Sequence, residues 1–87
     1  METHEFIPAG KTLFVNADVK SGRLSVEVLD AAGNVIEGYD KEFSVIEKQD
    51  GVKLQIRWKR GEALPAGVPI RLRFHLENGD LYSYVID

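Results

Sequence analysis

Residues 70–86, IRLRFHLENGDLYSYVI, carry the clearest structural pattern of the sequence. Apolar and polar residues alternate up to Asn78-Gly79, and a second run of residues that favour strands follows. Alternation with a period of two is typical of a strand that buries one face. Asn-Gly is the strongest short-range signal of a two-residue hairpin loop. The sequence therefore predicts two antiparallel strands that are joined at Asn78-Gly79.

A two-residue loop also fixes which residues of this hairpin face each other. It places Leu76 opposite Leu81, and Phe74 opposite Ser83, on the inner face. On the outer face it pairs His75 with Tyr82 and Arg73 with Tyr84. We therefore expect a candidate binding surface of five side chains: Arg71, Arg73, His75, Tyr82 and Tyr84.

Shorter alternating runs cover residues 13–19, 24–28 and 54–58. Turn signals separate them, including Ser21-Gly22 and a second predicted hairpin turn at Asp50-Gly51. Residues 40–43 are consistent with a helical turn or a crossing loop, and residues 59–69 with a connection between sheets. Short strands at this spacing predict an all-β fold. We expect one antiparallel β-sandwich, immunoglobulin-like or jelly-roll-like, of about seven short strands.

A chain of 87 residues has room for one domain. We expect a lead-in segment over residues 1–10 and the sandwich over residues 11–87. Trp58 shares the parity of the apolar positions around it, which predicts a core tryptophan rather than a ligand platform. The predicted core consists of Val15, Leu24, Val26, Val28, Leu54, Ile56, Trp58, Leu72, Phe74, Leu76, Leu81 and Val85.

Composition argues against several classes of partner. The formal net charge is −3, so a nucleic-acid partner is not expected. No apolar run approaches the roughly 20 residues of a membrane span, and the first ten residues lack the apolar core of a signal peptide. The chain has no cysteine, so a thiolate metal site or a cysteine nucleophile is excluded.

Catalytic and metal-binding constellations are weak. The two histidines, His4 and His75, stand at opposite ends of the chain. Neither Ser44 nor Ser83 has the strand-turn-helix context of a nucleophile elbow. Aspartates recur in turns, which turn chemistry already explains. We expect no enzyme activity and no cofactor, with calcium held by loop carboxylates as a minor alternative.

Three readings of the predicted outer surface stay open. Arginine and tyrosine are enriched at protein–protein hot spots, which favours docking to a neighbouring domain. The same residues stabilise a solvated sheet through cross-strand stacking. Aromatic faces and arginine forks also suit a sugar ring. A second polar set, expected to be a solvated strand face, consists of Lys53, Gln55, Arg57, Lys59 and Arg60.

The order of several short motifs resembles a known module. They are residues 13–18 (LFVNAD) with 22–30 (GRLSVEVLD), 35–39 (VIEGY) with 56–59 (IRWK), and 69–74 (PIRLRF) with 81–84 (LYSY). Together they resemble the small β-sandwich near the C-terminus of bacterial sialidase-like and invertase-like glycoside hydrolases, the latter related to family 32. The resemblance extends from about Leu13 to Ile86. In the family a cysteine often follows an acidic pair in the middle loop, where this chain has Ser44.

The resemblance implies a non-catalytic accessory domain that packs on the catalytic domain of the same or a parent polypeptide. It also implies an extracellular or periplasmic location. The alternative is a carbohydrate-binding module that holds an oligosaccharide on the outer face of the C-terminal hairpin.

Overall fold

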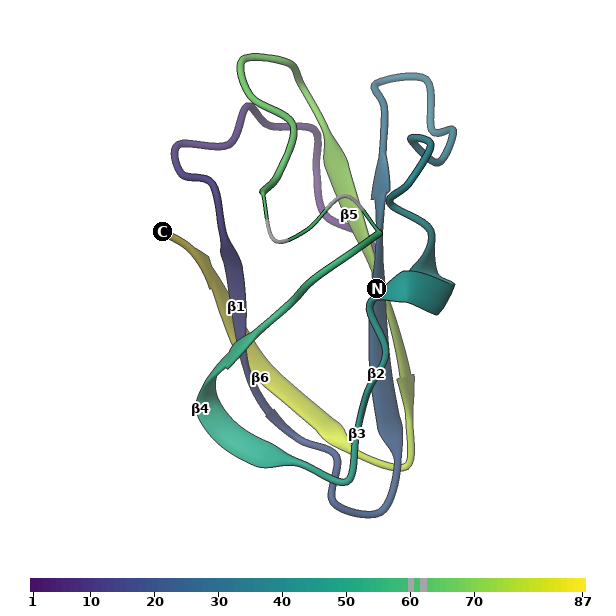
Figure 1. Cartoon of the computed structure of the whole chain (residues 1–87), viewed down its shortest axis with the longest axis vertical. Helices are drawn as coiled ribbons and strands as arrows, with labels where there is room; N and C mark the ends of the chain where they lie inside the picture. Colours follow the sequence, from purple (N-terminus) through teal and green to yellow (C-terminus); the bar gives the residue numbers. More distant parts are fainter. Residues whose placement is uncertain (60, 62) are drawn as a thin grey trace.

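Six strands form two antiparallel sheets of three strands each in the computed structural model, which describes residues 1–59, 61 and 63–87 (Figure 1). The first sheet has the order β4-β1-β6, and the second has the order β3-β2-β5. The predicted all-β antiparallel sandwich is confirmed. In chain order the elements are β1 (Leu13–Asp18), β2 (Arg23–Leu29), the 3-10 turn η1 (Lys41–Phe43), β3 (Ile46–Glu47), β4 (Asp50–Gln55), β5 (Arg71–Glu77) and β6 (Asp80–Ile86).

Three tight turns between strands pass from one sheet to the other. The turns β1–β2, β3–β4 and β5–β6 all lie at the narrow end of the sandwich, at the bottom of Figure 1. The predicted hairpin at Asn78-Gly79 is therefore wrong, because β5 pairs with β2 and β6 pairs with β1. Both a hairpin and a sheet-crossing arch bury one face of each strand, so the alternating pattern fits either.

Two glycines allow these arches to pack against each other. A Cβ on Gly22 would lie 1.8 Å from the carbonyl oxygen of Glu77. A Cβ on Gly79 would lie 2.6 Å from the carbonyl oxygen of Asp18 and 2.8 Å from a methyl group of Val19. No side chain fits at such distances. Glycine at these two turn positions therefore allows the backbones of neighbouring arches to approach each other closely.

The third arch turns at Lys48, which has a φ of 56°. Its amide donates to the carbonyl of Val19 (2.9 Å), and the amide of Val19 donates to the carbonyl of Gln49 (2.8 Å). The turn predicted at Asp50-Gly51 is wrong, because both residues lie inside β4. The hydrogen bonds to Val19 hold the turn two residues earlier.

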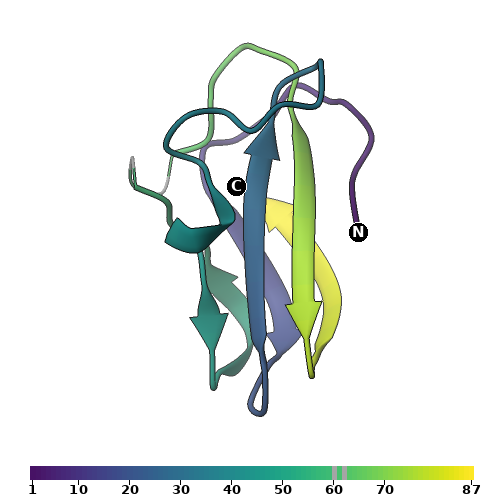
Figure 2. The ribbon, with the colours of Figure 1, turned by 90° about the vertical axis from the view of Figure 1, so that its right-hand side faces the viewer.

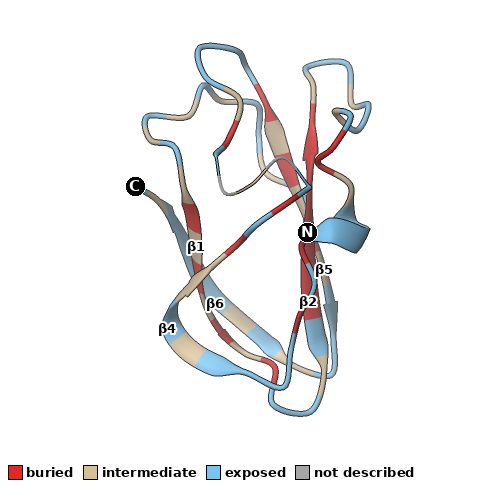
Figure 3. Cartoon of the chain, viewed as in Figure 1, coloured by how far each residue is buried: buried red, intermediate tan, exposed pale blue. Residues whose placement is uncertain are grey.

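The core lies between the sheets, and loop residues fill the end at which the sheets diverge (Figure 3). Eight of the twelve predicted core side chains are buried, and Leu54 and Leu81 pack partly buried against them. Leu76 and Val85 are 41% and 52% exposed, so their placement in the core is wrong. The core residues that the prediction omitted are Leu13, Ala17, Val19, Tyr39, Ile46, Leu64 and Ile70.

A bulge explains the exposure of Val85. The β1–β6 register shifts between Asn16 and Ala17, opposite Tyr82. One extra residue reverses the facing of the strand beyond it. Val85 therefore pairs with Phe14 on the outer face, while Tyr84 pairs with the buried Val15.

Along part of β2, side chains rather than a neighbouring strand form hydrogen bonds with its backbone. Strand β3 pairs only with Arg23 and Leu24. Beyond it, the amide of Val26 donates to Ser44 Oγ (2.8 Å), and the Ser44 hydroxyl donates to the carbonyl of Val26 (2.7 Å). Trp58 Nε1 donates to the same carbonyl (2.8 Å). The burial predicted for Trp58 is confirmed, since it is 5% exposed.

The first six residues run along the outer edge of β5 (Figure 2). The amide of Thr3 donates to the carbonyl of Leu72 (2.9 Å), and Phe6 and Ile70 exchange hydrogen bonds of 2.9 and 2.8 Å. The amide of Phe74 donates to the carbonyl of Met1 (2.7 Å). The segment expected as a lead-in thus covers one edge of the second sheet, up to Phe74.

Candidate functional site

The outer face of the second sheet carries a polar network around a buried carboxylate. Glu27 on β2 is 8% exposed and lies opposite Arg73 on β5. Its Oε1 accepts hydrogen bonds from Arg73 Nη1 (3.1 Å) and from His75 Nε2 (2.9 Å). A carboxylate only accepts, so Nε2 of His75 carries the hydrogen. This pairing compensates the buried charge of Glu27.

Glu2 of the N-terminal segment completes this network. Its carboxylate accepts from Arg73 Nε (3.1 Å) and from Arg71 Nη1 (3.4 Å). The hydrogen bond from Arg73 lowers the pKa of Glu2, and the same contact raises the pKa of Arg73. The polar network consists of Glu2, Glu27, Arg71, Arg73 and His75.

The three basic members of the predicted binding surface therefore lie together, and each of them already contacts a carboxylate. Arg71 Nε is the exception within the network, because it is buried and no described residue provides a hydrogen-bond partner for it. A sulfate or carboxylate ligand would have to displace Glu2 from both arginines. Sequence reasoning missed Glu27 because a glutamate on the outer face of a strand is usually solvated, and it missed Glu2 because that residue lies in a segment without periodicity. Their sequence signal is charge alone: acidic residues that can pair with the arginines of β5.

A shallow pocket of about 250 Å³ adjoins the network beside His75. Ser25 lies opposite His75 in the β2–β5 pairing, and Lys41 of η1 also lines the pocket. Both positive and negative side chains contribute to its lining. The full lining is Arg23, Ser25, Lys41, Glu42, Val45, His75 and Glu77.

The two tyrosines of the predicted surface lie in the other sheet, because β6 pairs with β1. The expected stack of His75 on Tyr82 and Arg73 on Tyr84 does not form. Tyr82 is 63% exposed, while Tyr84 turns inward and places its ring 5.3 Å from that of Phe74. The candidate surface is therefore divided between two faces.

Tyr82 and Tyr84 instead help to form what we call the edge pocket, which has a volume of about 320 Å³. It lies at the open side of the sandwich, where the N-terminal segment along β5 comes close to β6. Apolar and aromatic groups dominate its wall. The edge pocket is lined by Met1, Leu81, Tyr82, Ser83 and Tyr84.

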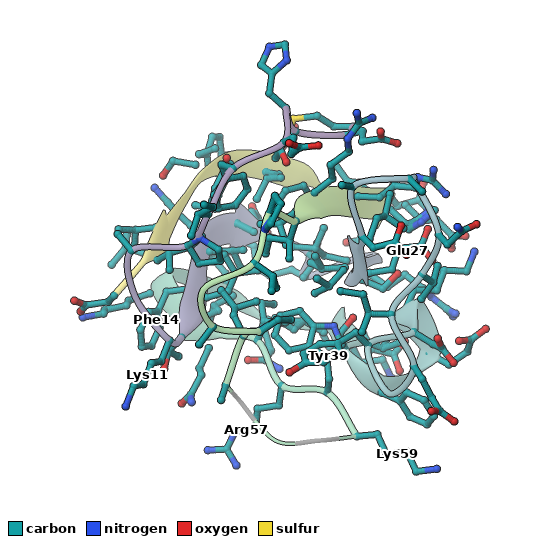
Figure 4. All side chains as sticks on the ribbon, turned by 90° about the horizontal axis from the view of Figure 1, so that it is seen from above. Lys11, Phe14, Glu27, Tyr39, Arg57 and Lys59 are labelled. Carbon is teal, nitrogen blue, oxygen red and sulfur yellow. The ribbon has the colours of Figure 1, made fainter. Side chains whose placement is uncertain are left out.

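The second polar set is exposed at three of its described positions, while Gln55 is half-buried. Lys53, Arg57 and Lys59 are exposed, and Figure 4 shows Arg57 and Lys59 pointing away from the body of the molecule. Lys53 pairs with Asp87 (3.5 Å) and lies 4.7 Å from the centre of the Phe14 ring. Arg60 lies outside the described residues.

Among residues 1–59, 61 and 63–87, no three histidine, aspartate or glutamate side chains are grouped so that they could hold a metal ion. The same residues form no helix with the length and apolar character that crossing a bilayer requires. Comparison of the chain with protein-family models, with curated proteins and with solved structures found no match.

Proposed function

We propose that this chain is a non-catalytic accessory module of a carbohydrate-active enzyme, which packs on the catalytic domain and stabilises it. The motif order that resembles the accessory sandwich of glycoside hydrolases supplies the class of enzyme. On the same basis we propose an extracellular or periplasmic location.

The edge pocket is the observation that carries the docking part of this proposal. Apolar surface rimmed by polar residues is typical of sites where another protein packs. Met1 and Tyr82 are 68% and 63% exposed at this place, which leaves apolar area for a partner to bury. Aromatic side chains are also among the residues most often found at hot spots.

Carbohydrate binding is the second candidate. Because the predicted hairpin face is divided between two sheets, the candidate sugar site has to be placed elsewhere. The arginines are occupied by Glu2 and Glu27, so an oligosaccharide would have to stack on Tyr82 and Tyr84 in the edge pocket. Titration of the isotope-labelled chain with plant, glycosaminoglycan and sialylated oligosaccharides tests this candidate. Shifts of Leu81 to Tyr84 at millimolar sugar would favour it over docking.

Capture of the partner tests the main proposal. The immobilised chain is exposed to the secreted proteins of the organism that encodes it, and the bound proteins are identified by mass spectrometry. We expect enrichment of a glycoside hydrolase, and we expect Tyr82→Ser to lose it. Val52→Ser is the matched control, because Val52 is 80% exposed on β4, at the opposite edge of the same sheet.

Two results would contradict the proposal. One is a set of captured proteins without any carbohydrate-active enzyme. The other is equal capture by the wild type and by Tyr82→Ser, since the edge pocket would then have no part in the contact.

A further inference from the structure

The outer edge of β6 is the one regular sheet edge that the described part of the chain leaves without protection. Residues 1–6 cover the edge of β5 up to Phe74, and β3 is only two residues long. β4 contains Gly51 and the charged Lys53, which discourage pairing with another strand. In contrast, residues 81–86 of β6 (LYSYVI) hold no charge, no proline and no glycine.

The backbone of β6 presents free hydrogen-bonding groups along this edge. Asp87 and Thr12 exchange hydrogen bonds of 2.9 and 3.2 Å, so Asp87 faces β1. In an antiparallel pair, successive residues face alternately toward and away from the partner strand. Tyr84 and Ile86 therefore point their N–H and C=O groups away from β1. The Leu13 carbonyl, opposite Ile86, accepts from Ile56 on the β4 side, as this alternation requires.

The edge pocket lies beside these free groups. An added strand would bond to Tyr84 and Ile86 through its main chain and place an apolar side chain against Met1 and Tyr82. Main-chain bonds provide affinity and pockets for alternate side chains provide specificity in β-strand addition. The bulge opposite Tyr82 limits regular pairing to the second half of β6.

We propose that β6 binds an extended segment of the partner enzyme by β-strand addition. This inference rests on the proposed function and specifies how the docking occurs. The segment has alternating apolar side chains and basic residues at its ends. Its chemistry follows from the exposed acidic residues that flank the uncharged run, Asp80 and Asp87. Asp87 also lies 3.5 Å from Lys53 on β4, so the preference for a basic end rests mainly on Asp80.

Charge argues against a second copy of the chain as the occupant. Antiparallel self-pairing centred on Tyr84 would bring Asp87 of each copy next to Asp80 of the other. Like charges at such positions destabilise a strand pair. Each copy also has a formal net charge of −3. A segment with lysine or arginine at its ends would instead place opposite charges next to Asp80 and Asp87.

Amide hydrogen exchange with a synthetic strand tests this proposal. The probe is the blocked peptide acetyl-Lys-Val-Thr-Val-Thr-Val-Thr-Val-Lys-amide, added to the full chain. In the free chain the amides of Tyr84 and Ile86 should exchange fast, while those of Ser83 and Val85 are protected by β1. At a peptide concentration ten times Kd, we expect exchange at Tyr84 and Ile86 to slow by about tenfold.

Control peptides and variants sharpen the result. Glutamate in place of both lysines should weaken binding by about threefold to tenfold, and a central proline should abolish it. Tyr82→Ser should also weaken binding, whereas Val52→Ser should not.

Three outcomes would overturn strand addition. They are no binding of the lysine peptide, shifts in the edge pocket without protection of Tyr84 and Ile86, and protection of these amides without peptide that grows with protein concentration. The last would identify a second copy as the occupant. None of them would remove enzyme capture, so failure of the proposed function remains distinguishable.

Discussion

Substitution of Ser44 by alanine tests how the backbone hydrogen-bonding groups at the edge of β2 are satisfied. Ser44 is 3% exposed, and its hydroxyl is the acceptor for the buried amide of Val26. In Ser44→Ala that amide loses its acceptor, while the carbonyl of Val26 keeps the bond from Trp58 Nε1. Leaving a buried donor unsatisfied costs about 1–3 kcal/mol. We expect the free energy of unfolding to fall by about this amount.

Urea unfolding measures this loss. With a slope of about 1–3 kcal/mol per M, a loss of about 2 kcal/mol lowers the midpoint by about 0.7–2 M. Ser21→Ala is the matched control, because Ser21 is exposed in a turn, and it should change stability by less than about 0.5 kcal/mol. A loss for Ser44→Ala as small as that of the control would refute the assignment of Ser44 as a substitute for a strand.

A double-mutant cycle with Trp58→Phe extends the test. Alone, Trp58→Phe removes one of two donors to the Val26 carbonyl and should cost about 0.5–1.5 kcal/mol from the hydrogen bond. Combined with Ser44→Ala, it leaves that carbonyl without either donor. The combined loss should therefore exceed the sum of the single losses. Strict additivity would show that the two donors do not act on one group.

Three further predictions concern the core, an arch and the N-terminal segment. Trp58→Ala should cost about 3–5 kcal/mol in urea unfolding, and an unchanged midpoint would contradict its burial. Gly79→Ala should cost about 1–3 kcal/mol, because its Cβ would meet the carbonyl of Asp18 at 2.6 Å. The pKa of Glu2 is lowered from 4.5, mainly by the hydrogen bond from Arg73, so its contribution to stability is present above that pH. It is lost as the pH falls through the lowered pKa. Exchange of the N-terminal amides should then accelerate, and Glu2→Gln should remove this pH dependence.

The positions of the main strands could be predicted from the sequence, but their pairing could not. Alternation around Val15, Val26 and Leu72 reports that one face of each strand is buried. It does not report which strand supplies the neighbouring hydrogen bonds. Asn78-Gly79 suits a hairpin by its local conformation, yet the close packing of Gly79 on Asp18 and Val19 is compatible with an arch. Such a long-range contact leaves no local signal.

The candidate site was predicted in part for the same reason. Arg71, Arg73 and His75 share a face because they alternate along one strand, which needs no knowledge of the partner strand. The placement of Tyr82 and Tyr84 depended on the hairpin register and on the absence of a bulge, and both assumptions were wrong. Glu2 belongs to a segment without periodicity, so its contact with Arg73 could not be predicted from the sequence.

Amide hydrogen exchange of the chain in complex with the enzyme that it captures would show whether docking occurs through β6. We expect slow exchange at Tyr84 and Ile86 on complex formation, with no change along β4. Protection confined to the polar network around Glu27, or to β4, would contradict the claim that this module docks through β6.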